Sequence, residues 1–198
     1  MVDLKEFEQK AADLRVLGMK ISIGQDTVYE KYWDEDCRRN IYSASKSFTS
    51  CAVGFAVQEG LIDLDERLMD AFKEDIPNNP DENLKKATVK DLLTMTLGQE
   101  KGFLMGKQRR RMEEQNWVKA SLAIPFVYEP GTHFVYNNVG PYLAGILVQR
   151  RAGCDLLSYL TPRLLKPLGI RKTIWEVDPE GNTFGAGGLF LTVSELHK

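Results

Sequence analysis

Ser43 and Lys46 are the residues whose types and spacing suggest chemistry. They lie in a run from Ile41 to Gln58 that is rich in Ala, Val, Phe and small hydroxyl residues, and Lys46 is its one charged side chain. A serine three residues before a lysine shares a helix face with it. A buried ammonium is costly, so its pKa tends to fall and the amine can then deprotonate a neighbouring hydroxyl. The spacing is therefore compatible with a nucleophilic serine and a lysine base.

The same pair also has a structural interpretation. Ser43 can cap a helix, and the stem of Lys46 can lie along the core while its amine reaches water. A single Ser-x-x-Lys pair arises easily by chance, so spacing alone leaves both interpretations open. The uniformly apolar or small character of residues 41–58 predicts a helix that is buried on all sides.

A second group, Tyr136-Asn137-Asn138, stands directly before an apolar segment. Taken alone, it predicts Asn138 as a helix N-cap and Tyr136 as a partly buried aromatic residue. The chain has two histidines, His133 and His197, and no Gly-x-Ser-x-Gly sequence, which argues against a Ser-His-Asp enzyme. Neither histidine has the spacing of a metal ligand, so we expect no metal and no cofactor.

Composition excludes some classes of partner. A net charge of −2, with 43% hydrophobic and 27% charged residues, is ordinary for a globular protein and gives no reason to expect nucleic acid or a membrane surface as partner. The basic run at residues 107–111 is followed by Glu113 and Glu114, which predicts a solvated helix face.

The cysteines and the N-terminus bear on the compartment. Cys37, Cys51 and Cys154 are odd in number and widely spaced. Cys51 and Cys154 are expected to be small core residues in a reducing compartment. The first residues show no secretory signal and no segment reaches membrane-spanning length, so we expect a cytoplasmic protein.

Hydrophobic spacing predicts the elements that position these residues. Helices are expected over 3–17, 41–58, within 61–72, from 88 towards Gly98, and over 108–122, 139–151 and 155–165, with Ser194 capping a last one. One hairpin, formed by 19–23 and 28–33, contains the only convincing strands. A hairpin alone is marginally stable, so the rest of its sheet is expected to lie outside these residues or to come from another chain. Its open edges predict self-association.

The motifs and their order resemble the class C β-lactamase-like serine hydrolases of the penicillin-recognising group. That family carries Ser-x-x-Lys on a helix and Tyr-x-Asn on a loop. Further matching segments are 60–65, 88–96, 129–132, 136–140, 167–175 and 187–189, which extend the resemblance over nearly the whole chain. One departure is Leu97, where the family has a small residue before the glycine at Gly98.

The resemblance implies an α/β fold of the β-lactamase/transpeptidase type. Residues 1–198 would form a single incomplete domain, in which 1–42 give the N-terminal helix and hairpin of the α/β part and 43–198 the mainly helical part. The family's third motif, Lys/His-Thr/Ser-Gly on a strand, does not occur in the sequence. Lys172-Thr173-Ile174 lacks the glycine and lies in the wrong place. The resemblance thus implies a C-terminally truncated chain without the remaining strands.

The resemblance also assigns roles. Ser43, Lys46 and Tyr136 would be catalytic and Asn138 would bind substrate, in a serine hydrolase that forms an acyl-enzyme on an ester, a β-lactam or a D-amino-acid amide or peptide. The expected partner is a small-molecule or peptide substrate, with no nucleic acid and no membrane. The missing third motif leaves a second function class open, namely a non-catalytic, truncated binding module.

Overall fold

The structure, a computed structural model, describes residues 4–198. The α-helices are α1 (Lys5–Asp13), α2 (Ser45–Gln58), α3 (Leu68–Ala71), α4 (Glu82–Lys86), α5 (Val89–Thr94), α6 (Gly106–Arg109), α7 (Trp117–Leu122), α8 (Val139–Ala152), α9 (Leu156–Leu160) and α10 (Val193–Leu196). A 3₁₀ turn, η1 (Tyr42–Ala44), leads into α2, and a π-helical turn, η2 (Thr161–Leu165), follows α9. The strands are β1 (Gly18–Ile23), β2 (Asp26–Tyr32), β3 (Arg39–Asn40) and β4 (Phe190–Leu191).

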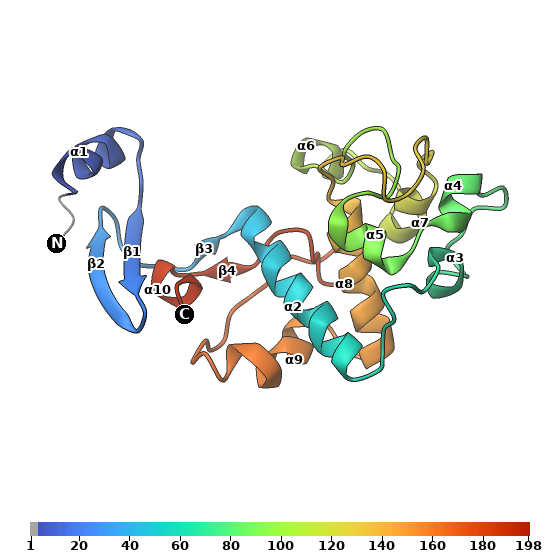
Figure 1. Ribbon diagram of the computed structural model, residues 1–198. Helices are drawn as coiled ribbons and strands as arrows, with labels where there is room; N and C mark the ends of the chain where they lie inside the picture. The colour runs from blue at the N-terminus through green and yellow to red at the C-terminus, as the bar shows by residue number, and fades with distance from the viewer. Residues whose placement is uncertain (1–3) are drawn as a thin grey trace.

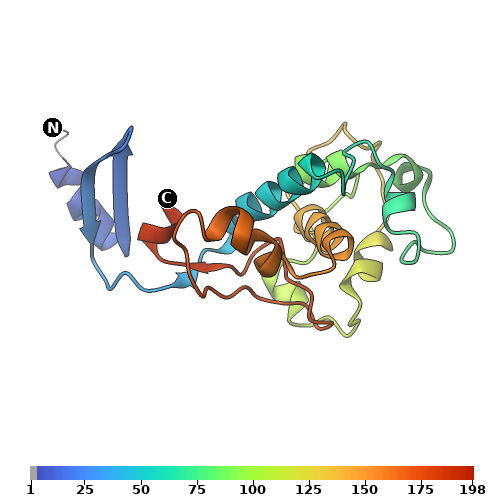
Figure 2. The ribbon, with the colours of Figure 1, turned by 90° about the horizontal axis from the view of Figure 1, so that it is seen from below.

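Helix α8 is the centre of the helical body. Its residues from Val139 to Gln149 are all buried, and α2 and α5 pack against it (Figures 1 and 2). Gly140 permits the contact with α5, because a Cβ atom there would lie 2.3 Å from the carbonyl oxygen of Leu92. The close packing of α8 fixes the start of this helix, and with it the loop that carries Tyr136.

The start of α2 is held by a segment near the other end of the chain. Strand β3 pairs antiparallel with β4, and Ile41 N–H donates to Leu189 O at 2.9 Å. Leu189 N–H in turn donates to Ser45 Oγ at 3.1 Å. One turn later, Thr49 Oγ donates to Gly185 O at 2.7 Å. Residues 185–191 thus brace the end of the helix where Ser43 lies.

The hairpin stands at the opposite end of the molecule from the helical body, with α1 on one side and α10 on the other (Figure 1). Strands β1 and β2 are antiparallel, from Gly18 opposite Tyr32 to Ile23 opposite Asp26. Tyr32 and Ser194 share a hydrogen bond at 2.9 Å, which ties the hairpin to α10. Within residues 4–198 no third strand pairs with this hairpin. The predicted α/β fold, a mainly helical part with an N-terminal helix and hairpin, is confirmed.

The helix predicted over 3–17 is shorter in the structure. Asp3 lies outside the described residues, and α1 ends at Asp13. The prediction that residues 41–58 are buried on all sides is wrong, because Ser47, Cys51 and Gly54 form an exposed face of α2. Cys51 is therefore not a core residue, and Cys154 is only half-buried. Small residues are compatible with burial but do not require it.

Three further expectations change. The helix predicted over 108–122 is divided into α6 and α7, and Asn116 caps α7 by accepting a hydrogen bond from Lys119 N–H at 2.8 Å. Strands β3 and β4 were not predicted, because two residues are too few to show alternation. Thr192 rather than Ser194 caps α10, through a 3.0 Å bond from Glu195 N–H.

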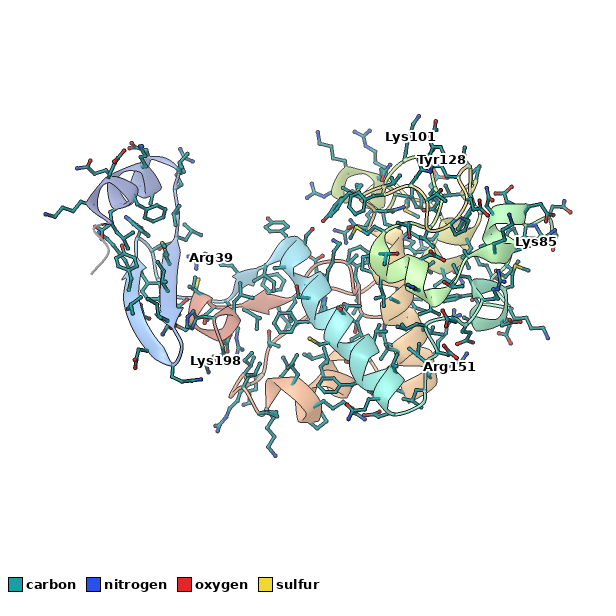
Figure 3. The ribbon with its side chains drawn as sticks, viewed as in Figure 1. Arg39, Lys85, Lys101, Tyr128, Arg151 and Lys198 are labelled. Atoms are coloured by element: carbon teal, nitrogen blue, oxygen red, sulfur yellow. The ribbon has the colours of Figure 1, made fainter. Side chains whose placement is uncertain are left out.

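Charged side chains such as Lys85, Lys101 and Arg151 project from the periphery of the helical body (Figure 3). In the part of the chain that the structure describes, none of the helices combines the length and the apolar character that crossing a bilayer requires.

Candidate active site

Ser43 lies in η1, and Lys46 lies in the first turn of α2. Lys46 Nζ donates a hydrogen bond to Ser43 Oγ at 3.1 Å, as the three-residue spacing predicts. Lys46 Nζ also donates to Ala186 O at 2.6 Å, in the segment that braces α2. The amine is therefore directed at the serine and is not simply extended into water.

Tyr136 reaches the same point from the loop before α8. Its hydroxyl donates to Ser43 Oγ at 2.7 Å. Lys46 Nζ lies 5.2 Å from the centroid of the Tyr136 ring, within the range of a cation–π contact. A hydroxyl, an amine and a phenol thus meet at Ser43.

The electrostatics of this group favour proton transfer. Burial lowers the pKa of Lys46, and the positive charge of Arg109 lowers it further, against the opposing effect of Tyr136. Burial raises the pKa of Tyr136, but its interactions with Ser43 and Lys46 outweigh burial and lower the net pKa below the usual value. Both groups therefore lose their protons more readily than an isolated lysine or tyrosine, and as neighbours they titrate as a pair.

The residue before Ser43 has an unusual backbone conformation. Tyr42 has φ = +48°, a left-handed value that is rare for a large side chain. Asn40 Oδ1 accepts a hydrogen bond from Tyr42 N–H at 2.7 Å, and Asn40 Nδ2 donates to Glu176 Oε1 at 3.0 Å. Ser45 Oγ donates to Tyr42 O at 2.6 Å. Strain of this kind persists only where surrounding contacts hold it, and it is often found at functional sites.

A cavity of about 600 Å³ opens beside Ser43. Its wall is formed by Asn40, Tyr42, Ser43, Met105, Gly106, Arg109, Arg110, Trp117, Asn138, Glu176, Phe184, Ala186, Gly187 and Gly188. Cavities of this size accept small molecules. The serine hydroxyl therefore has room for a bound substrate next to it.

Asn138 belongs to this wall and occupies the N-cap position of α8, as expected, but its side chain makes no capping hydrogen bond. Asn137 Oδ1 accepts the hydrogen bond from Val139 N–H instead, at 2.9 Å. Asn138 Nδ2 donates to Leu104 O at 3.0 Å, and Asn138 Oδ1 is buried without a hydrogen-bond partner. The amide therefore has a fixed orientation and one free acceptor. The Asn138 amide makes no hydrogen bond to Lys46.

Arg109 was missed by the sequence analysis, which assigned residues 107–111 to a solvated helix face. In the structure the guanidinium carbon lies 4.1 Å from the centroid of the Phe184 ring, and Nη1 is 3.5 Å from Glu176 Oε2. Arg109 therefore faces the cavity. Its contacts are with residues far along the chain, so the local charge pattern could not reveal them. Asn40 and Glu176 were also missed, because no motif marks them.

Comparisons with known proteins agree with this architecture. A profile of the family described as Beta-lactamase matches residues 5–192. A Monacolin J acid methylbutanoyltransferase of Aspergillus terreus is 31% identical over 157 residues, which cover 69% of this chain and 37% of that protein. A Lovastatin esterase of Penicillium rubens is 30% identical over 150 residues, covering 65% of this chain and 37% of that protein.

Solved structures show the same fold. An octameric penicillin-binding protein homologue from Pyrococcus abyssi has a TM-score of 0.77 at 22% identity, covering 98% of this chain and 55% of that one. A class C beta-lactamase has a TM-score of 0.76 at 18% identity, covering 98% and 61%. The chain thus spans little more than a third of these curated relatives and just over half of the solved chains. It belongs to the beta-lactamase family, whose relatives include hydrolases and acyltransferases.

Proposed function

We propose that this chain carries the nucleophile of a serine hydrolase and forms an acyl-enzyme on Ser43. The observation that carries the proposal is the convergence of Lys46 Nζ and the Tyr136 hydroxyl on Ser43 Oγ, at 3.1 and 2.7 Å. A structural lysine would extend its amine to water, whereas here the amine is partly buried and donates a hydrogen bond to Ser43 Oγ. The arrangement has the parts of an activated nucleophile.

In the proposed reaction, Ser43 Oγ attacks a carbonyl carbon and its proton passes to the Lys46–Tyr136 pair. The bond between carbonyl carbon and leaving group breaks, and the pair returns a proton to the leaving group. Water then attacks the acyl-enzyme, and Ser43 is released. The Ser43 N–H would be one donor to the negative oxygen of the intermediate. The free Oδ1 of Asn138 would accept a hydrogen bond from the substrate.

The substrate class we propose is an ester, a β-lactam or a D-amino-acid amide or peptide. The names of the matched relatives, an esterase and a methylbutanoyltransferase, support acyl chemistry on esters. These names do not identify the acyl group that this chain would transfer.

A fluorophosphonate probe tests the proposal. The purified chain is incubated with the probe, and the labelled residue is located by mass spectrometry. We expect labelling at Ser43 that is lost in Ser43→Ala and kept in Ser47→Ala, because Ser47 is exposed on the same helix and lies outside the cavity. Cooperative thermal melting of all three chains confirms that they are folded.

One alternative is a binding module without catalysis, in which the cavity beside Ser43 and the unpartnered Asn138 Oδ1 hold a ligand. It predicts a folded chain that resists labelling and still binds a ligand beside Ser43. A cooperative melt together with unlabelled Ser43 would support this alternative and contradict the hydrolase proposal.

For location, we propose the cytoplasm, because Cys37, Cys51 and Cys154 are all free thiols, which a reducing compartment preserves. Cell fractionation with an antibody against the protein tests this. Recovery from a secreted or periplasmic fraction would contradict it.

A further inference from the structure

Residues that carry unpartnered polar atoms line the Ser43 cavity. Across residues 4–198, four buried side-chain nitrogen or oxygen atoms lack a hydrogen-bond partner, and three of them belong to residues of this wall. They are Arg109 Nε, Trp117 Nε1 and Asn138 Oδ1. Buried polar groups are nearly always paired, so such a group of atoms indicates contacts that a bound molecule completes. Two of the three are N–H donors.

Arg109 is held in place without using up its donors. Its guanidinium stacks over Phe184, which is almost fully buried, so the group has a rigid support. Its acidic neighbour, Glu176, is 3.5 Å from Nη1, too far for a strong charge-assisted hydrogen bond. Glu176 also accepts from Asn40. The planar guanidinium group of an arginine held in this position matches the two oxygens of a carboxylate.

Trp117 supplies the second donor. Only 7% of the residue is exposed, and its ring packs edge-on against Tyr142 and Phe184, at centroid distances of 6.3 and 5.8 Å. An indole N–H can only donate, so it selects for an acceptor. Arg110 adds a second positive charge to the wall, against the single negative charge of Glu176. The cavity thus combines a net positive charge with unused donors.

We propose that this cavity binds a carboxylate on the substrate, so that the preferred substrates are acyl compounds carrying a negative charge on the acyl group. Arg109 and Trp117 donate hydrogen bonds to the carboxylate, while Ser43 attacks the reactive carbonyl at the other end of the acyl group. This inference rests on the proposed serine hydrolase function and adds the substrate's charge to it.

The test compares two esters that differ only in charge. The p-nitrophenyl monoester of glutaric acid carries a free carboxylate, and the p-nitrophenyl ester of glutaramic acid carries an uncharged amide of the same shape. Acylation is followed by the mass of the acylated chain and by the p-nitrophenol release in excess of that seen with Ser43→Ala, since the glutarate ester also cyclises unaided to the anhydride. The variants are Arg109→Gln, Arg109→Lys and Trp117→Phe. Arg111→Gln is the matched control, because Arg111 is exposed and lies outside the wall.

We expect the unaltered chain to react about tenfold to a hundredfold faster with the acid ester, the usual range for one charge-assisted contact. Arg109→Gln brings the ratio of the two rates to about one, and Arg109→Lys keeps part of it because the charge remains. Trp117→Phe lowers the ratio several-fold. Arg111→Gln leaves both rates as they were. A ratio near one in the unaltered chain, or a ratio that Arg109→Gln does not change, would overturn the proposal.

A binding measurement separates this proposal from the reaction itself. If neither ester acylates Ser43, the hydrolase proposal fails, and the carboxylate site is decided by calorimetric titration of the folded chain with glutarate and with glutaramide. Tighter binding of glutarate that Arg109→Gln weakens about tenfold or more supports the site. Equal or undetectable binding of the two compounds rejects it.

Discussion

The Tyr136 hydroxyl donates a hydrogen bond to Ser43 Oγ at 2.7 Å, although 93 positions separate the two residues. Ser43 is set by η1 and the start of α2, and Tyr136 by the loop that leads into the buried helix α8. The contact therefore depends on how α2 packs against α8.

Removing the Tyr136 hydroxyl should slow reaction at Ser43 without unfolding the chain. Tyr136→Phe is expected to lower the fluorophosphonate labelling rate by about a hundredfold or more, the usual contribution of a positioned acid–base group. Because Tyr136 is 44% exposed, thermal stability should change little. Tyr128→Phe is the control, since Tyr128 also lies in the helical body (Figure 3) but stacks on His133 instead. Equal labelling rates in the two variants would remove Tyr136 from the mechanism.

The labelling rate should rise with pH and level off below the range of an ordinary lysine. Burial lowers the pKa of Lys46, and contacts with Ser43 and Lys46 give Tyr136 a lowered net pKa. The reactive form has lost a proton from this pair, so it accumulates as pH rises through the lowered pKa. Measured from pH 6 to 11, the unaltered chain should reach its plateau before an amine of pKa about 10.5 would. In Lys46→Met this limb should move to higher pH, because Tyr136 loses the positive charge that lowers its pKa. A limb that stays where it was would assign the proton to another group.

Asn40 should matter for reactivity although it is not expected to touch substrate-reacting atoms. It accepts from Tyr42 N–H and so holds the φ = +48° conformation beside Ser43. Asn40→Ala should lower the labelling rate and cost about 1 kcal/mol of unfolding free energy. Adding Tyr42→Gly should restore part of the rate, since glycine adopts this conformation without strain. No rescue in the double variant would show that Asn40 acts in some other way.

Two glycines in central helices should respond oppositely to alanine. Gly140→Ala places a methyl group against Leu92 O and should lower the free energy of unfolding by about 2 kcal/mol or more. Gly54→Ala, on the exposed face of α2, meets no atom within 4 Å and should raise it by about 0.5–1 kcal/mol. Urea denaturation measures both. A tolerated alanine at 140 would mean that α5 and α8 are not packed this closely.

The open hairpin should drive self-association. In the described part of the chain β1 and β2 pair only with each other, and Val28 on β2 is 48% exposed. Exposed strand edges pair readily with other strands. Light scattering at increasing concentration should show a rising mean mass, reduced by Val28→Lys. Val127→Lys is the control, at an equally exposed valine in the helical body. A mass that stays monomeric at all concentrations would contradict the proposal.

Much of the fold followed from local pattern. Alternation at residues 19–23 and 28–33 predicted the hairpin, and the apolar run after Asn138 predicted α8 to within one residue of its end. The Thr88–Asp91 pair marked the start of α5, where Asp91 Oδ2 accepts from Thr88 N–H at 2.9 Å. These signals work because they involve residues within one or two turns of each other.

The candidate site likewise combines one local feature with several that depend on distant segments. The sequence by itself determined that Ser43 and Lys46 face each other, since helix geometry fixes residues three apart. Only the tertiary structure decided that Tyr136 reaches them, that Asn40 and residues 185–191 brace the start of α2, and that Arg109 faces the cavity. Each of these depends on a contact between segments far apart in the chain, and no spacing within a single helix or strand records such a contact.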